Sequence, residues 1–193
     1  MKRICVFCGS RTGALPEYQA VAQAVGVALA QRQITLVYGG GNVGLMGILA
    51  DAVLRHGGTA IGVIPRALVH REVAHTQLSE LCVVGSMHER KQQMADLSDG
   101  FIALPGGIGT LEEFTEIFTW AQLGLHLKPC GLLNVAGYYD RLIEFLDHTV
   151  AEGFLAAEHR SMLLVAHEPE LLLEMFRNYK PPRVERWLDR AAT

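Results

Sequence analysis

The sequence predicts an α/β fold built on a doubly wound parallel sheet with helices on both faces. Short apolar runs alternate with longer amphipathic ones along the chain, which is the pattern of strand–helix–strand units. The short runs are almost continuously apolar, as strands buried on both faces must be. Glycine-rich segments follow two of these runs, as they do at the carboxyl ends of strands that bind ligands.

The first third of the chain alternates strand, helix, strand and helix. The apolar run 4–8 is a strand that ends at a glycine. A helix over 16–32 follows, with Pro16 in the first turn, where no N–H is needed. The run 34–38 is rich in β-branched and aromatic residues, which favour strands, and an apolar helix ending near Gly57 comes after it.

The middle of the chain continues the alternation. The run 59–64 is a third strand, because it is apolar and Pro65 stops it. The run 81–84 is the fourth, and an amphipathic helix over 87–97 separates it from a fifth strand at 101–104.

The last third begins with a helix that ends near Leu123. A sixth strand over 130–134 follows, and the helical pattern returns at 138–150 and 169–176. A short apolar run at 162–165 is a candidate seventh strand.

The length and composition fit one domain. The chain has 193 residues, and half of them are apolar, which is enough for a core without disulfides or metals. Lys180, Pro181 and Pro182 mark the expected end of the fold. Residues 1–180 are therefore predicted to form a single domain, and 181–193 a C-terminal tail.

The charge and hydropathy exclude several classes of protein. A formal net charge of −3 disfavours a nucleic-acid-binding surface, which would usually be basic. No apolar run approaches the ~20 residues of a membrane helix. The apolar stretch near the N-terminus is too short for the core of a signal peptide. We expect a cytoplasmic protein that binds neither nucleic acid nor membrane.

The cysteines and histidines do not indicate a metal site. Cys5 and Cys8 have the C-x-x-C spacing of redox and metal motifs, but both fall on the first strand, where positions three apart point to opposite faces. A redox or metal role stays open, and small buried thiols are the preferred interpretation. The eight histidines do not cluster along the chain.

The first glycine-rich segment, 39–47, follows the second strand and contains G-x-G-x-x-G at Gly39, Gly41 and Gly44. In a dinucleotide site an acidic residue ~20 positions later holds a ribose hydroxyl. Here the end of the next strand has no acid, which disfavours an NAD-dependent reaction. Gly40, Gly41 and Gly44 remain candidates for contact with a phosphorylated ligand.

The second glycine-rich segment, 105–113, adds a hydroxyl and carboxylates to the turn after the fifth strand. Thr110 as N-cap and Glu113 as third helical residue would form a capping box. A chemical role for Glu113 is an equally supported interpretation. Glu112 and Glu116, four apart, share one helix face, whereas Glu113 projects about 100° away, so the three need not do the same job.

The helix after the fourth strand begins with an unusual charge pattern. Ser86 and Glu89 have capping-box spacing. Arg90 and Lys91 lie in the first turn, where the helix dipole disfavours cations. A bound anion or a nearby carboxylate would explain them, and solvated surface cations are the alternative.

Two motifs together resemble a known family. The stretch P-G-G-x-G-T-x-x-E at 105–113, combined with M-x-x-R-K at 87–91, resembles the Lonely Guy family of cytokinin riboside 5′-monophosphate phosphoribohydrolases. The resemblance extends through 39–47, 119–124, 131–134 and 137–139 and covers nearly the whole chain to about Tyr179.

The resemblance implies a Rossmann-like fold, usually a homodimer, that acts without metal or cofactor on a small nucleotide. Arg90 and Glu113 match the catalytic pair of the family. Other positions match residues that line the nucleotide site, with Met87 as a further candidate. They are Glu72, Lys91, Gly107, Ile108, Gly109, Thr110, Leu111, Glu112 and Thr119.

The implied activity is hydrolysis of the N-glycosidic bond of a purine nucleoside 5′-monophosphate, giving free base and ribose 5-phosphate. A non-catalytic nucleotide carrier of the same fold is the alternative. Members of the family were often labelled lysine decarboxylases, but no site for pyridoxal phosphate is apparent around the four lysines. No motif distinguishes AMP from an N6-modified AMP. Trp120, Leu123 and Leu125 are expected in the core or at a dimer interface.

Overall fold

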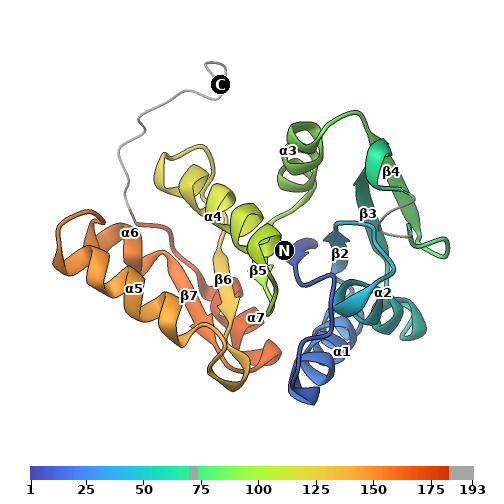
Figure 1. The fold of residues 1–193 in the computed structure, drawn as a ribbon, viewed down its shortest axis with the longest axis horizontal. Coiled ribbons are helices and arrows are strands. Elements are labelled where there is room, and N and C mark those ends of the chain that lie inside the picture. The colour runs from blue at the N-terminus through green and yellow to red at the C-terminus, as the bar shows by residue number, and fades with distance from the viewer. Residues whose placement is uncertain (70–73, 183–193) are drawn as a thin grey trace.

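The structure is a computed structural model that describes residues 1–69 and 74–182. Within them lies one sheet of seven parallel strands in the order β4-β3-β2-β1-β5-β6-β7 (Figure 1). Every expected strand is formed, including the short seventh. The bounds are β1 Arg3–Phe7, β2 Thr35–Tyr38, β3 Ala60–Pro65, β4 Glu80–Val84, β5 Gly100–Ala103, β6 Cys130–Leu133 and β7 Leu163–Ala166.

Helices cover both faces of the sheet, as predicted. One buried cluster joins the sheet to α1, α2 and α7, and a second joins its other face to α3, α4 and α5. The short helix α6 was not expected, because five residues are too few to show a helical period. The helices are α1 Pro16–Gln31, α2 Gly44–Arg55, α3 Met87–Leu97, α4 Ile108–Gln122, α5 Asp140–Ala151, α6 Ala157–Ser161 and α7 Pro169–Asn178, with 3₁₀ turns at Arg66–Leu68 and Val135–Gly137.

The central strand β1 shows why its sequence is apolar from Ile4 to Phe7. Ile4, Val6 and Cys8 belong to the cluster under α1 and α2, while Cys5 and Phe7 belong to the cluster under α3 and α4. The C-x-x-C pair therefore points to opposite faces, as the strand period predicted. Both cysteines are free, and burial raises the pKa of each thiol, with the charge of Glu113 adding to the effect.

The strand order creates a crevice beside β1. The chain runs outward from β1 to β4 and then returns to place β5 on the other side of β1, in register from Ile4 opposite Gly100 to Phe7 opposite Ala103. The loops after the two strands stay together, since the N–H of Gly9 donates to the carbonyl of Pro105 at 3.1 Å. A ligand site is expected where the direction of winding reverses in this way.

The expected tail lies outside the described residues from 183 onward. In the described part of the chain, no helix has the length and apolar character needed to cross a membrane.

Candidate active site

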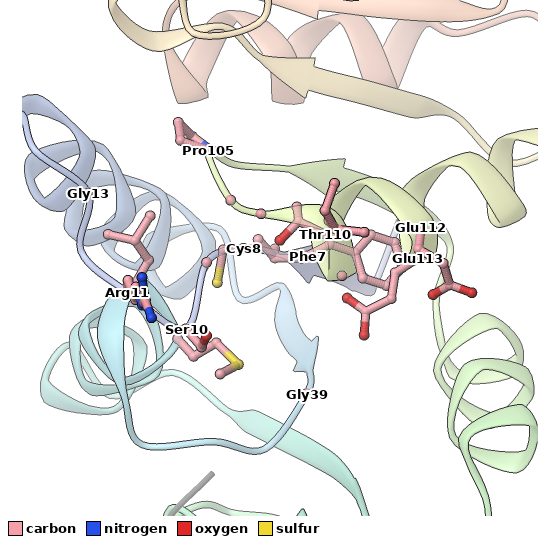
Figure 2. A pocket seen from close by; sticks show the side chains of 18 of the residues that line it. Phe7, Cys8, Ser10, Arg11, Gly13, Gly39, Pro105, Thr110, Glu112 and Glu113 are labelled. Atoms are coloured by element: carbon pink, nitrogen blue, oxygen red, sulfur yellow. The ribbon is translucent and has the colours of Figure 1, made fainter.

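A cavity of about 610 Å³ opens at the carboxyl ends of β1, β2 and β5, at the point where the winding reverses. The first turns of α3 and α4 close its other side (Figure 2). Most of the residues predicted for the site line this one cavity. They are Met87, Arg90, Gly107, Ile108, Gly109, Thr110, Glu112 and Glu113.

The start of α4 corrects one sequence prediction. The helix begins at Ile108 with Gly107 as its N-cap, and none of the described side chains caps it. The predicted capping box of Thr110 and Glu113 is therefore wrong. The extended backbone of Gly107 (φ −88°, ψ −157°) already accepts from the N–H of Leu111 at 3.2 Å, which starts the helix three residues earlier. Glu113 then falls in the second turn and points into the cavity instead of at its own helix end.

The first turn of α4 offers backbone donors to the cavity. The first four N–H groups of a helix have no acceptor within the helix, and here they belong to Gly107, Ile108, Gly109 and Thr110. The positive end of the helix dipole lies at the same place. No acidic residue occupies this turn. The turn is therefore suited to an anion.

The three glycines of this turn have different reasons to be glycine. A Cβ at Gly106 would overlap the hydroxyl of Thr110 and lie 2.9 Å from the nitrogen of Gly9, so packing requires glycine there. A Cβ at Gly107 or Gly109 would meet nothing within 4 Å. Internal packing does not explain these two, whereas close approach of a ligand to the backbone would.

Arg90 lies on α3 and is 4% exposed. Its Nε donates to the carbonyl of Val63 at 3.1 Å, and one Nη donates to the carbonyl of Gly39 at 3.0 Å. The other Nη lies 3.8 Å from Oε1 of Glu113, whose side chain is 14% exposed. A Cβ at Gly39 would overlap the guanidinium, which explains the glycine at the end of β2. The arginine thus fixes the place of the Glu113 carboxylate beside the cavity.

Lys91 serves a different pair of carboxylates. Its Nζ lies 2.6 Å from Glu112 and 2.7 Å from Glu116, the two acids that share a face of α4. Burial disfavours the charged amine, but the hydrogen bond that Lys91 donates to Glu112 and the close contact with the charged Glu116 outweigh this and raise the pKa of Lys91. The helix period predicted that Glu113 would have a role different from that of Glu112 and Glu116, and their pairing with different cations confirms it. Both cations at the start of α3 are buried beside carboxylates, so the solvated-cation alternative is wrong.

The other predicted caps and contacts fall as follows. Ser86 caps α3 by accepting from the N–H of Glu89 at 3.1 Å. The Glu89 carboxylate accepts in return from the N–H of Gly85 at 2.7 Å, one residue before the N–H that a capping box would use.

Three other predicted site residues are not among the described residues that line the cavity. Leu111 packs against the buried cluster under α3 to α5 and does not line the cavity. Thr119 is exposed, with its hydroxyl donating to the carbonyl of Thr115 at 2.7 Å. Glu72 lies outside the described residues.

The first glycine-rich segment contributes Gly39, Leu45 and Met46 to the lining of the cavity, but its predicted contact residues Gly40, Gly41 and Gly44 do not line it. Gly40 has φ +77° and is packed against Ile64 and Leu81. Gly41 forms an isolated antiparallel bridge with Ala74. Gly44 has φ +58°, and a Cβ there would overlap the backbone of the loop after β1. These glycines allow segments of backbone to approach one another.

Sequence reasoning missed the loop that follows β1. Ser10, Arg11 and Thr12 line the cavity, and Figure 2 shows Ser10 and Arg11 across it from Thr110 and Glu113. The sequence held a signal for them, because a polar loop directly after the first strand must lie at the same sheet edge as the loop after the fifth.

Two tyrosines also line the cavity and were not predicted. The hydroxyl of Tyr138 donates to the carbonyl of Gly106 at 2.5 Å. Its ring meets that of Tyr18 edge to face, with centroids 5.6 Å apart. No sequence signal marked this pair, since the two lie far apart along the chain.

A second cavity of about 560 Å³ lies between α3 and α4 and shares no lining residue with the first. Lys91 lines this second cavity and contacts Glu112, which lines the first. Trp120, Leu123 and Leu125 line it, and all three are half-buried. Among the residues that the structure describes, no group of three His, Cys, Asp or Glu side chains could hold a metal ion.

Comparison with known sequences finds a matching family model and relatives that share one activity in their names. A family model described as "Possible lysine decarboxylase" matches residues 46–176. A probable cytokinin riboside 5′-monophosphate phosphoribohydrolase of Oryza sativa subsp. japonica is 51% identical over 93% of this chain and 79% of its own. A cytokinin riboside 5′-monophosphate phosphoribohydrolase of Arabidopsis thaliana is 50% identical over 93% of this chain and 83% of its own.

Solved structures support the fold alone. The molybdenum cofactor binding protein of Rippkaea orientalis is 24% identical with a TM-score of 0.69, covering 92% of this chain and 97% of its own. The molybdenum cofactor carrier protein of Chlamydomonas reinhardtii is 20% identical with a TM-score of 0.70, covering 92% and 96%.

Proposed function

The chain belongs to the Lonely Guy family of cytokinin riboside 5′-monophosphate phosphoribohydrolases, and from this premise we propose that it hydrolyses purine nucleoside 5′-monophosphates to free base and ribose 5-phosphate. As a member of this family, the chain is an N-glycosidase. AMP and N6-modified AMP are the substrates proposed here.

One observation carries the proposal: a half-buried carboxylate, Glu113, faces a cavity whose adjoining wall is an uncapped helix start. Cleavage of the glycosidic bond develops positive charge on the ribose and negative charge on the base. A carboxylate beside the sugar stabilises the positive charge on the ribose, and backbone N–H donors can bind the phosphate and so position the sugar.

The reaction then divides among the residues as follows. The N–H groups of Gly107 to Thr110 bind the 5′-phosphate. Glu113 lies by the ribose, where it orients water or stabilises the cationic sugar. Water adds to C1′, the bond from C1′ to the base nitrogen breaks, and the released base takes up a proton. Arg90 keeps Glu113 in place, because an acid displaced by 1 Å can lose about 10²-fold in rate.

The lysine decarboxylase label of the family model has no support in the site. No lysine is among the described residues that line the cavity. The amine of Lys91, which contacts the lining residue Glu112, is paired with two carboxylates, and its pKa is raised. A Schiff base needs an uncharged amine, which this environment opposes.

The decisive experiment measures free adenine and ribose 5-phosphate released from AMP by the wild type and by Glu113→Gln. We expect the substitution to lower kcat about 10²–10⁴-fold with an unchanged circular dichroism spectrum. Glu112→Gln is the matched neighbour, with a smaller loss because its carboxylate binds Lys91. Near-normal turnover by Glu113→Gln would remove this acid from the mechanism.

The second candidate function is a nucleotide carrier, which the fold shared with cofactor-carrying proteins makes worth testing. A carrier would bind AMP in calorimetry and release no adenine. Parallel assays with AMP, N6-modified AMP and adenosine separate carrier from enzyme and also give the base preference.

The family resemblance further suggests a cytoplasmic homodimer that needs no metal or cofactor. The half-buried Trp120, Leu123 and Leu125 beside α3 and α4 are the apolar surface we propose for its interface. Light scattering of the wild type and of Leu123→Asp tests this: the dimer mass should be lost in the variant.

A further inference from the structure

We infer that Arg11 is a phosphate-binding residue, supplying the side-chain cation that faces the 5′-phosphate across the cavity from α4. The inference rests on the proposed function, since it concerns the substrate of the same site. It assigns a role to a residue that neither the sequence motifs nor the family pattern singled out.

The charge balance of the cavity calls for such a cation. A phosphate monoester carries about −1.5 to −2 charges at pH 7. A helix N-terminus offsets only about half a charge. The charged side chains among the described lining residues are Arg11, Arg90, Glu112 and Glu113.

Three of these four groups are already paired within the protein. Glu112 is bound by Lys91 at 2.6 Å. Arg90 donates to two backbone carbonyls and pairs with Glu113, so its charge is offset where it lies. Arg11 is exposed, and no described residue forms a hydrogen bond or ion pair with its guanidinium. Among the described lining residues, Arg11 is therefore the cation that no described carboxylate offsets.

The loop that bears Arg11 is held beside the start of α4. Gly9, two residues before Arg11, donates to Pro105 at 3.1 Å and accepts from Leu45 at 3.0 Å. A Cβ at Gly9 would lie only 3.3 Å from the Cα of Gly106, so the two loops run in contact.

The other end of the loop is fixed as well. Gly13 has φ +77° and packs directly on the ring of Tyr18. That ring meets Tyr138, whose hydroxyl binds Gly106 at the start of the α4 turn. The loop is thus anchored on both sides of Arg11 to the turn that offers the N–H groups, and the guanidinium lines the cavity without a partner in the part of the chain that the structure describes. Figure 2 shows Arg11 and Thr110 on facing walls.

The test compares kinetics of the wild type, Arg11→Ala, Arg11→Lys and Arg141→Ala with AMP and with adenosine. Arg141 is a matched control, because it is a 91% exposed arginine on α5, away from the cavity. We expect Arg11→Ala to raise the KM for AMP roughly 10–100-fold, as loss of a charge-assisted contact does, with kcat changed far less. Activity on adenosine should stay the same, Arg11→Lys should recover part of the loss, and Arg141→Ala should match the wild type.

The outcomes are distinguishable. An active wild type with an unchanged KM for AMP in Arg11→Ala, or an equal loss on adenosine, overturns the role of Arg11 and leaves the proposed function standing. A wild type that releases no base overturns the proposed function. Calorimetric titration with ribose 5-phosphate then still decides Arg11: weaker binding by Arg11→Ala supports it, and equal binding refutes it.

Discussion

The guanidinium of Arg90 lies 3.8 Å from the carboxylate of Glu113, and carbonyls of Val63 and Gly39 hold its other nitrogens. Two helices that pack on the same face of the sheet are thereby joined at the edge of the cavity. In the proposed mechanism Arg90 positions the acid and the backbone N–H groups of the α4 turn bind the substrate.

Arg90→Lys should lower kcat at least about 10²-fold while changing the KM for AMP less than about threefold. A lysine keeps the charge but cannot reach two carbonyls and a carboxylate with the geometry of a guanidinium. Steady-state kinetics check the split between kcat and KM. A large rise in KM with normal kcat would mean that Arg90 binds substrate instead of placing Glu113.

Lys91→Met should lower Tm by roughly 2–4 °C, which is about 1 kcal/mol for a chain of this size. The pKa of Lys91 is raised in the folded state. Its contribution to the free energy of unfolding is therefore complete below the unfolded pKa of about 10.4, and it is lost as the pH rises through the folded pKa. Denaturant unfolding at pH 7, 9 and 11.5 measures the free energy of unfolding of the wild type and of Lys91→Met. The stability gap between them should be the same at pH 7 and 9 and shrink at pH 11.5; a constant gap would contradict the ion pairs.

Gly106→Ala and Gly109→Ala should behave in opposite ways. The first drives a Cβ into the Thr110 hydroxyl and the backbone of Gly9, and should cost roughly 1–3 kcal/mol of unfolding free energy. The second meets nothing within 4 Å and replaces a helical glycine, so its Tm should be equal or higher. Its KM for AMP should still rise about tenfold, since the methyl group enters the space beside the N–H donors. Normal KM in Gly109→Ala would show that the phosphate lies elsewhere.

Tyr138→Phe should lower kcat/KM for AMP roughly 3–10-fold with a loss of stability of only about 1 kcal/mol. The substitution removes the hydrogen bond to Gly106 and keeps the ring against Tyr18. Tyr139→Phe is the comparison, because its buried hydroxyl donates to Leu104 at 2.6 Å and its loss should affect stability more than catalysis. The reverse order of effects would rule out a role for Tyr138 in holding the loop.

The sequence predicted most of the fold, since the pattern of side chains along each segment encodes it. All seven strands and every long helix appear where the apolar runs and helical periods placed them. The same period assigned Glu113 a direction different from that of Glu112 and Glu116, and the structure confirms it. The paired motifs indicated the family, which the relatives confirm.

The tertiary structure decided what depends on segments distant in the chain. The start of α4 moved to Ile108 because Gly107 is extended and Thr110 is buried against Gly106, which no local capping rule contains. The carboxylates beside Lys91 and the loop of Arg11 beside the α4 turn follow from β1 lying between β2 and β5. A sequence encodes the faces of its own elements through their periods, but the neighbours of those faces are set by strand order and packing, which only the folded chain determines.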